Sequence, residues 1–304
     1  MNVIFVGGTG RCGTSITKEV IAKHPKVASL PFEYRFIVDP DGLIDFYTSY
    51  AASWTPYMAD KRLKRLESLL VSLSGDGDFR RYGGWELNEH IPDFRTYVSE
   101  LMDDLRDFSF MATWVGAENY TSTPELYHAK AMSKYELVAP ISRFIRKVIG
   151  SLIEKDGAEF FVEDNTWNIL FAKELLELIP EAKIIHVYRD PRDVVASMIH
   201  QDWCPTDEWE AALWYKSIIQ RWFGVRLQIP AGSYIEIKLE DLVSSTEETV
   251  RGICKFTGFP YAPAMFDINL GDAHIGRWKD DFSDREKDNV ESVLHEIIEE
   301  LEYE

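Results

Sequence analysis

The sequence predicts an α/β fold of three layers, with a central parallel sheet and helices on both faces. Short apolar runs alternate with amphipathic helical stretches over residues 1–38 and again over residues 159–304. Strands that alternate with helices in this way form parallel sheets. Residues 39–158 mix aromatic and charged helical stretches without this rhythm, so they predict a helical insertion. We therefore expect a single domain, with a core of residues 1–38 and 159–304 that carries the insertion.

Five short apolar segments predict the strands of the sheet. They are residues 3–6, 27–30, 160–162, 183–188 and 234–239. The helices expected between and after them begin near Thr14, Asn165, Pro191, Thr246 and Asp284. Two of these helix starts are well marked, because Asp190 precedes Pro191 as an N-cap, and Ser283 with Glu286 forms a capping box.

The turn between the first strand and the first helix is rich in glycine. Residues 5–15 read FVGGTGRCGTS, with four glycines within seven positions. Such glycines let backbone amides turn inward, and the N-terminal N–H groups of the next helix face the same hollow. Gly8 and Gly13 have the spacing of a Walker loop, but Thr14 stands in the place of its lysine and Arg11 is the loop's only cation. The sequence thus predicts a P-loop-like fold with an anion-binding loop, where a plain tight turn needs fewer glycines.

A second strand also ends in a turn that suits an anion. Residues 183–197 read KIIHVYRDPRDVVAS, a strand followed by Arg189, Arg192 and a helix that carries Ser197. In a parallel sheet both turns lie beyond the carboxyl ends of the strands, which is where ligands bind. A nucleotide with phosphates at both ends would need such a pair of turns.

Both turns resemble motifs of the sulfotransferases that use 3′-phosphoadenosine 5′-phosphosulfate (PAPS). The loop resembles their phosphosulfate-binding sequence G-x-x-R-S-G-T-[ST], with Cys12 in place of the serine. Residues 182–197 resemble the 3′-phosphate motif, whose first arginine and closing serine map onto Arg189 and Ser197. Residues 234–242 and 275–278 resemble the last core strand with its E-D-L turn and a late Gly-Arg-Trp segment. The resemblance is to the tyrosylprotein-type and bacterial R-S-G-T-T branch of the family.

The resemblance implies which residues bind the donor. PAPS is the expected donor, its product is adenosine 3′,5′-bisphosphate (PAP), and no metal is expected. The implied donor-binding residues are Gly8, Thr9, Gly10, Arg11, Cys12, Gly13, Thr14, Ser15, Arg189, Ser197, Arg277 and Trp278.

The resemblance also implies a catalytic base. In the tyrosylprotein branch a His-Pro pair is followed by E-x-R, whose glutamate is the general base. Here Glu33-Tyr34-Arg35 follows His24-Pro25, one residue later than in that branch. Glu33 is thus the expected base, Arg35 is expected to orient it or the acceptor, and Arg11 to neutralise charge on the transferring group. The alternative bases are His200 and His274, whereas His186 lies inside a predicted strand and is expected to be structural.

One departure from the family concerns a lysine. Many relatives place a lysine after the third strand to stabilise the transferring group, but residues 163–166 of this chain read EDNT. The role is therefore absent or supplied from elsewhere, with Lys18 and Lys279 as the candidates.

We interpret the chain as a PAPS-dependent sulfotransferase that acts on a hydroxyl or amine of a small molecule, carbohydrate or peptide. Residues 39–158 are expected to bind the acceptor, with Trp54, Trp85 and Trp114 as possible lining residues. Two alternatives stay open. The Gly8–Gly13 spacing also suits a P-loop small-molecule or nucleoside kinase, and the missing lysine suits a catalytically inactive PAP- or PAPS-binding protein.

Charge and cysteine content limit the partners and the compartment. With 33 basic and 51 acidic residues the formal net charge is -18, which repels polyanions, so nucleic acid is not an expected partner. The three cysteines, Cys12, Cys204 and Cys254, are odd in number and far apart, which favours a reducing compartment. No apolar run has the length of a signal peptide core or of a membrane span, so we expect a cytoplasmic protein without membrane contact. The sequence indicates no oligomeric state.

Overall fold

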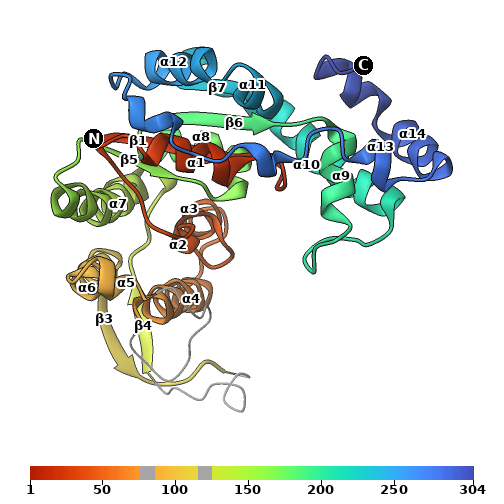
Figure 1. Ribbon diagram of the computed structural model, residues 1–304. Helices are drawn as coiled ribbons and strands as arrows, with labels where there is room; N and C mark the ends of the chain where they lie inside the picture. Colours follow the sequence, from red (N-terminus) through yellow and green to blue (C-terminus); the bar gives the residue numbers. More distant parts are fainter. Residues whose placement is uncertain (76–85, 116–124) are drawn as a thin grey trace. The chain divides into compact units, whose positions relative to one another are not determined.

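The computed structural model describes residues 1–75, 86–115 and 125–304 (Figure 1). These residues form two compact units. The first, here called the helical unit, comprises Leu30–Gly157 with Met1 and Glu177–Pro180. The second, the sheet unit, comprises Asn2–Ser29, Ala158–Leu176 and Glu181–Glu304. Each unit is described in its own right below.

The sheet unit is built around five parallel strands in the order β2-β5-β1-β6-β7. The strands are β1 (Asn2–Gly7), β2 (Val27–Ala28), β5 (Phe160–Glu163), β6 (Lys183–Tyr188) and β7 (Tyr234–Lys238). All five predicted strands are present, although β2 is shorter than expected. The first strand is central, since β1 pairs with β5 on one side and with β6 on the other.

Helices cover both faces of this sheet, as predicted. Alternate residues such as Ile4 of β1 and Ile185 of β6 belong to one buried cluster with residues of α1 (Thr14–Ala22), α11 (Leu239–Ser244) and α12 (Thr246–Thr257). The intervening residue His186 points the other way and packs on Trp222 of α10 (Glu208–Arg226), with ring centroids 4.9 Å apart. The period of two along a strand thus sends side chains into two separate apolar layers.

Two predicted helix starts have the expected caps. The Asp190 side chain accepts the N–H of Arg192 at 2.9 Å, and Pro191 opens α9 (Pro191–Met198). Ser283 and Glu286 form the predicted capping box of α14 (Asp284–Glu300). The remaining short helices of this unit are η1 (Thr166–Phe171), α8 (Ala172–Leu178), η2 (Ala231–Ser233), η3 (Pro263–Phe266), η4 (Gly271–Ala273) and α13 (Trp278–Asp281).

The predicted helix over residues 165–178 is divided into η1 and α8. The Asn165 side chain accepts the N–H of Trp167 at 3.0 Å, while Asn168 Nδ2 donates to the Val6 carbonyl at 2.9 Å. These bonds to side chain and strand hold the first turns in the tighter 3₁₀ form. The sequence reading also missed α10, although Asp207 caps it by accepting the N–H groups of Trp209 and Glu210.

The helical unit is not purely helical. Its helices are α2 (Arg35–Val38), α3 (Leu43–Tyr50), α4 (Pro56–Ser74), α5 (Leu87–His90), α6 (Phe94–Leu105) and α7 (Lys134–Asp156). It also holds an antiparallel pair, β3 (Arg106–Met111) with β4 (Glu125–Ala129), which the sequence did not predict. After Arg106 every residue of β3 is exposed, so the strand lacks the apolar alternation by which strands are recognised.

Candidate functional site

The turn after β1 has a backbone that depends on glycine. Gly10 and Gly13 have φ values of 83° and 98°, and Arg11 between them also has a positive φ of 56°. A Cβ atom added at Gly8 would lie 2.2 Å from Cys12 Sγ and 2.7 Å from the Val187 carbonyl oxygen. The loop backbone at Gly8 therefore lies so close to Cys12 and Val187 that a residue with a Cβ atom would clash with them.

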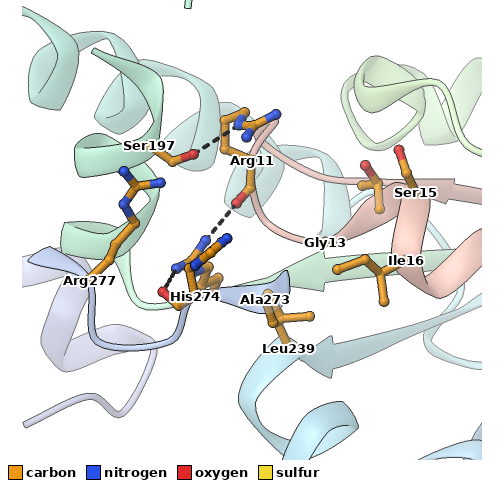
Figure 2. A pocket seen from close by; sticks show the side chains of 11 residues that line it. Arg11, Gly13, Ser15, Ile16, Ser197, Leu239, Ala273, His274 and Arg277 are labelled. Atoms are coloured by element: carbon orange, nitrogen blue, oxygen red, sulfur yellow. Dashed lines mark hydrogen bonds between the residues drawn. The ribbon is translucent and has the colours of Figure 1, made fainter. Parts of the chain in front are cut away.

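The loop forms one wall of a pocket in the sheet unit (Figure 2). The other walls come from the start and end of α9, from the residue after β7, and from the segment around His274. The lining residues are Arg11, Gly13, Thr14, Ser15, Ile16, Arg189, Ser197, Leu239, Ala273, His274 and Arg277. The lining thus brings together three arginines and the N-terminus of α1, and it includes no carboxylate. Such a pocket favours an anion.

Two of the three arginines of this pocket are bonded to its walls, whereas Arg277 Nε donates to Asp281 Oδ2 at 2.6 Å, outside the lining. Arg11 Nε donates to Ser197 Oγ at 2.9 Å, and Arg189 Nη1 donates to the Arg11 carbonyl at 3.4 Å. Arg189 Nη2 donates to the carbonyl of His274. Burial lowers the pKa of Arg11, and the like charges of Arg277 and Arg189 lower it further. The arginines repel one another, so a bound anion would relieve this repulsion.

Asp193 connects two of the pocket's walls. This buried carboxylate on α9 accepts the N–H of Gly276 at 2.6 Å and that of Trp278 at 3.0 Å. Its Oδ2 also lies 3.2 Å from Arg189 Nη2. Sequence reasoning gave Asp193 no role, although it stands only four residues after Arg189, which precedes α9 and pairs with it.

Other predicted donor-binding residues lie away from the pocket lining. Gly8, Thr9, Gly10 and Cys12 shape the loop, and Thr9 and Cys12 are buried. Burial raises the pKa of the Cys12 thiol, against hydrogen bonds from Thr9 and the loop backbone. The Trp278 ring packs against the guanidinium of Arg192, whose Cζ lies 4.2 Å from the ring centroid. Trp278 lines a different pocket, together with Lys279.

The predicted catalytic pair belongs to the helical unit. Arg35 Nη2 lies 2.8 Å from Glu33 Oε2, and Arg35 Nη1 lies 3.6 Å from Asp39 Oδ2. Both Glu33 and Arg35 keep 28% of their side-chain surface exposed. The pair therefore has the contact expected of an oriented carboxylate within its own unit.

The three histidines considered in the sequence, His186 and the alternative bases His200 and His274, differ in their surroundings. His186 is buried, its Nδ1 lies 2.9 Å from Glu236 Oε1, and burial lowers its pKa more than Glu236 raises it. It packs under α10, away from the pocket lining, and is structural. His200 is exposed after α9, and His274 lines the pocket.

Acidic residues stand at the end of β5 and directly after it, where many relatives have a lysine. Glu163 is buried and accepts the N–H of Asn165 at 2.7 Å, so it stabilises the turn into η1. The next residue, Asp164, pairs with Lys18 of α1, with Nζ and Oδ1 3.6 Å apart. Lys18 thus brings a cation to the segment in which many relatives have their lysine.

The predicted acceptor-lining tryptophans are not equally described. Trp114 Nε1 donates to Asp60 Oδ2 at 3.0 Å, Trp54 is exposed, and Trp85 lies outside the described residues. In the described ranges, no group of three or more His, Cys, Asp or Glu side chains could hold a metal ion. Nor do the described residues include a helix long and apolar enough to cross a membrane.

The fold and the pocket define an α/β protein with an arginine-lined pocket beyond the ends of β1 and β6. Residues 66–263, more than half of the chain, match the model of the sulfotransferase family. The chain therefore belongs to this family, and the predicted class of enzyme, a sulfotransferase, is confirmed.

One solved structure supports the fold, and two further matches are reported beside it. The sulfotransferase domain from the curacin biosynthetic pathway is 14% identical, and the alignment covers 100% of this chain and 98% of that one with a TM-score of 0.51. The sulfotransferase domain of the Synechococcus olefin synthase is 15% identical, with coverages of 96% and 86% and a TM-score of 0.44. Sulfotransferase STF1 from Mycobacterium tuberculosis is 14% identical, with coverages of 90% and 75% and a TM-score of 0.45. No curated protein matches the chain.

Proposed function

We propose that the protein transfers the sulfuryl group of PAPS to a hydroxyl or amine acceptor. The observation that carries the proposal is the pocket of three arginines and one helix N-terminus whose lining contains no carboxylate. PAPS carries anionic groups at its 3′ and 5′ positions, so it offers two negative ends to such a pocket. The apolar side chains of Ile16 and Leu239 in the same lining offer a surface for its base.

In this proposal the two turns hold the two ends of the donor. Arg189, Ser197 and Arg277 bind the 3′-phosphate, and Arg11 with the loop amides binds the phosphosulfate. Two features of the residues fit this role. A Cβ at Gly13 would lie 2.6 Å from Leu239 Cδ1, so glycine keeps the cradle open. Arg189 Nε is buried without a hydrogen-bond partner among the described residues, a donor that a phosphate oxygen would satisfy.

The reaction is an in-line displacement at sulfur. The acceptor oxygen or nitrogen forms a bond to sulfur while the bond from sulfur to the 5′-phosphate oxygen breaks, and PAP leaves with the negative charge. Arg11 and the loop amides neutralise that charge. Glu33 takes the proton that the acceptor loses, and Arg35 holds the Glu33 carboxylate in one orientation. Lys18 is our candidate for the cation that many relatives supply after this strand.

The acceptor and the compartment are the less constrained parts of the proposal. We assign acceptor binding to residues 39–158 and expect a small molecule, carbohydrate or peptide. The net charge of -18 disfavours strongly sulfated acceptors. A cytoplasmic location is supported by three cysteines that are all free thiols.

Ligand binding tests the donor. We expect PAP, added together with a metal chelator, to raise the unfolding temperature of the protein. Mg-ATP, added without the chelator, should produce a smaller shift. Binding of Mg-ATP but not of PAP would favour the kinase alternative and overturn the proposal.

Single-turnover transfer from labelled PAPS to a pool of hydroxyl acceptors, detected as a gain of one SO₃ unit, tests the base. The Glu33→Gln variant should be slower by about a hundredfold to ten-thousandfold, the usual contribution of a general base. Glu100→Gln is the matched control, because Glu100 also pairs with a cation of the helical unit, Lys147. Equal rates for wild type and Glu33→Gln would remove Glu33 as the base. PAP binding without any transfer would favour an inactive binding protein.

A further inference from the structure

Asp193 contacts three groups next to the pocket, although no role has been assigned to it. Its buried side chain accepts hydrogen bonds from Gly276 and Trp278 and pairs with Arg189. The two backbone donors flank Arg277, which itself lines the pocket. The Asp193 carboxylate therefore binds one pocket arginine, Arg189, and also binds the backbone on both sides of a second pocket arginine, Arg277.

The segment around Arg277 is bonded to Asp193 on both sides of the arginine. Gly276 has a φ of 80°, and the N–H groups at 276 and 278 both point to Asp193. Hydrogen bonds to a buried carboxylate are strong because the acceptor is charged and water is excluded. Figure 2 shows the Arg277 side chain rising from this segment toward the Arg11–Ser197 pair.

We infer that Asp193 is a positioning residue for the donor: it fixes Arg189 and the 276–278 segment together, so that Arg189 and Arg277 address the same phosphate. This inference rests on the proposed function, because it assumes that the pocket binds the 3′-phosphate of PAPS or PAP. Asp193 itself does not line the pocket, so it acts through the two arginines.

A nearby pair shows what a purely structural carboxylate looks like. Asp190 binds Arg192 through Nε and Nη2, at 3.0 and 2.9 Å. Arg192 also contacts Glu291 and the carbonyl of Glu304 and does not line the pocket. Loss of that pair would affect folding, whereas loss of the Asp193 contacts should affect the recognition of one phosphate.

Calorimetric titration with PAP and with adenosine 5′-monophosphate, which lacks the 3′-phosphate, separates these effects. For Asp193→Asn we expect PAP affinity to fall by about tenfold to a hundredfold, the usual value of hydrogen bonds to charged groups. Affinity for adenosine 5′-monophosphate should change less than about threefold. Glu247→Gln, which removes an exposed carboxylate paired with Arg251, should leave both affinities unchanged.

Steady-state kinetics and a double mutant give a second readout. The KM for PAPS of Asp193→Asn should rise in proportion to the loss of PAP affinity, with a much smaller change in kcat. In an Arg277→Gln background the same substitution should cost less PAP affinity, because part of its effect passes through Arg277.

Gly276→Ala provides a test that leaves Asp193 in place, should Asp193→Asn fail to fold. No atom lies within 4 Å of the added Cβ, but its φ of 80° is unfavourable for alanine, so the turn should relax. We expect this variant also to lose PAP affinity selectively. Wild-type affinities for PAP in both folded variants, or equal losses for the two nucleotides, would overturn the role of Asp193. Failure of the wild type to bind PAP would instead overturn the proposed function.

Discussion

Two neighbouring strands of the sheet, β1 and β6, end in turns that line one pocket but are built in different ways. After β1 the turn is made of backbone, with glycines that leave room for amides and one arginine. After β6 the turn is made of side chains, with Arg189 held by Asp193 and by two carbonyls. Because β1 pairs with β6, both turns reach the same pocket.

This difference predicts how each turn can be damaged. A backbone cradle tolerates a change of side chain but not an added Cβ atom, since the space is used by the chain itself. A side-chain cluster tolerates small changes in bulk but not the loss of a charge. Substitutions at Gly8, Arg189, Arg192 and Cys12 test this distinction, and one at Glu236 tests a contact outside both turns. They follow from the largest expected effect to the smallest.

The Gly8→Ala substitution should have the largest effect. Its Cβ would meet Cys12 Sγ at 2.2 Å and the Val187 carbonyl at 2.7 Å, so loop and strand must move apart. We expect kcat/KM for PAPS to fall by more than about a hundredfold, and the unfolding free energy by about 1–3 kcal/mol. Gly224→Ala is the control, because no atom within 4 Å meets its Cβ in α10 and alanine favours helix. Normal PAP binding by Gly8→Ala would argue against a backbone cradle.

Arg189 and Arg192 offer the next comparison, since both belong to the second turn. Arg189→Ala should weaken PAP binding by about tenfold to a hundredfold and leave adenosine 5′-monophosphate binding nearly unchanged. Arg192→Ala should lower the unfolding temperature, because Asp190 loses its partner, without changing the ratio of the two affinities. If the ratio of PAP to adenosine 5′-monophosphate affinity changed only in Arg192→Ala, then Arg192 and not Arg189 would be the arginine that binds the phosphate.

The contact between His186 of β6 and Glu236 of β7 should make stability depend on pH, whereas the turn after β6 should respond to ligand. Burial alone would raise the pKa of Glu236, but hydrogen bonds from His186 and Trp222 and the charge of Arg226 lower it to about 2. Its contribution to stability is thus present above pH 4.5 and is lost as the pH falls toward about 2. The lowered pKa of His186 acts in the same direction below pH 6.5.

We therefore expect the unfolding temperature of Glu236→Gln to fall less than that of the wild type as the pH is lowered from 4.5 toward about 2. The difference between the two drops should be a few degrees. Thermal unfolding followed by circular dichroism over a pH series measures the difference. PAP affinity near neutral pH should be unchanged, because Glu236 does not line the pocket. Parallel acid profiles for the two proteins would contradict the assignment of this network.

Short apolar segments made the strands of the sheet predictable. Residues 160–162 are wholly apolar and residues 183–188 largely so, and both form buried strands. Residues 234–239 form the less buried strand β7. The β3–β4 pair was missed because its exposed strand carries no such run, and η1 because its tight turns depend on Asn168 reaching the distant Val6 carbonyl.

The candidate site was predictable for a related reason. Arg11, Arg189, Ser197 and Arg277 belong to short motifs, and the structure brings all four to one pocket; their role in binding the donor stays a prediction. Asp193 was missed because its partners lie 83 and 85 residues away, so only the folded chain identifies them. Glu33 and Arg35 also stay a prediction as catalytic residues.

The Cys12→Ser substitution should have the smallest effect and tests the backbone cradle most directly. Cys12 is fully buried, and serine is the residue that the resembling motif has at this place. Thr9 and the loop amides that hydrogen-bond the Cys12 sulfur can donate equally to a serine oxygen, so the hydroxyl is not left unsatisfied. We expect PAP affinity within about twofold of wild type and a change in unfolding free energy below about 1 kcal/mol. Isothermal titration and chemical unfolding measure both. A tenfold loss of PAP affinity in a stably folded Cys12→Ser protein would mean that the thiol itself shapes the cradle, and the distinction between a backbone turn and a side-chain turn would not hold.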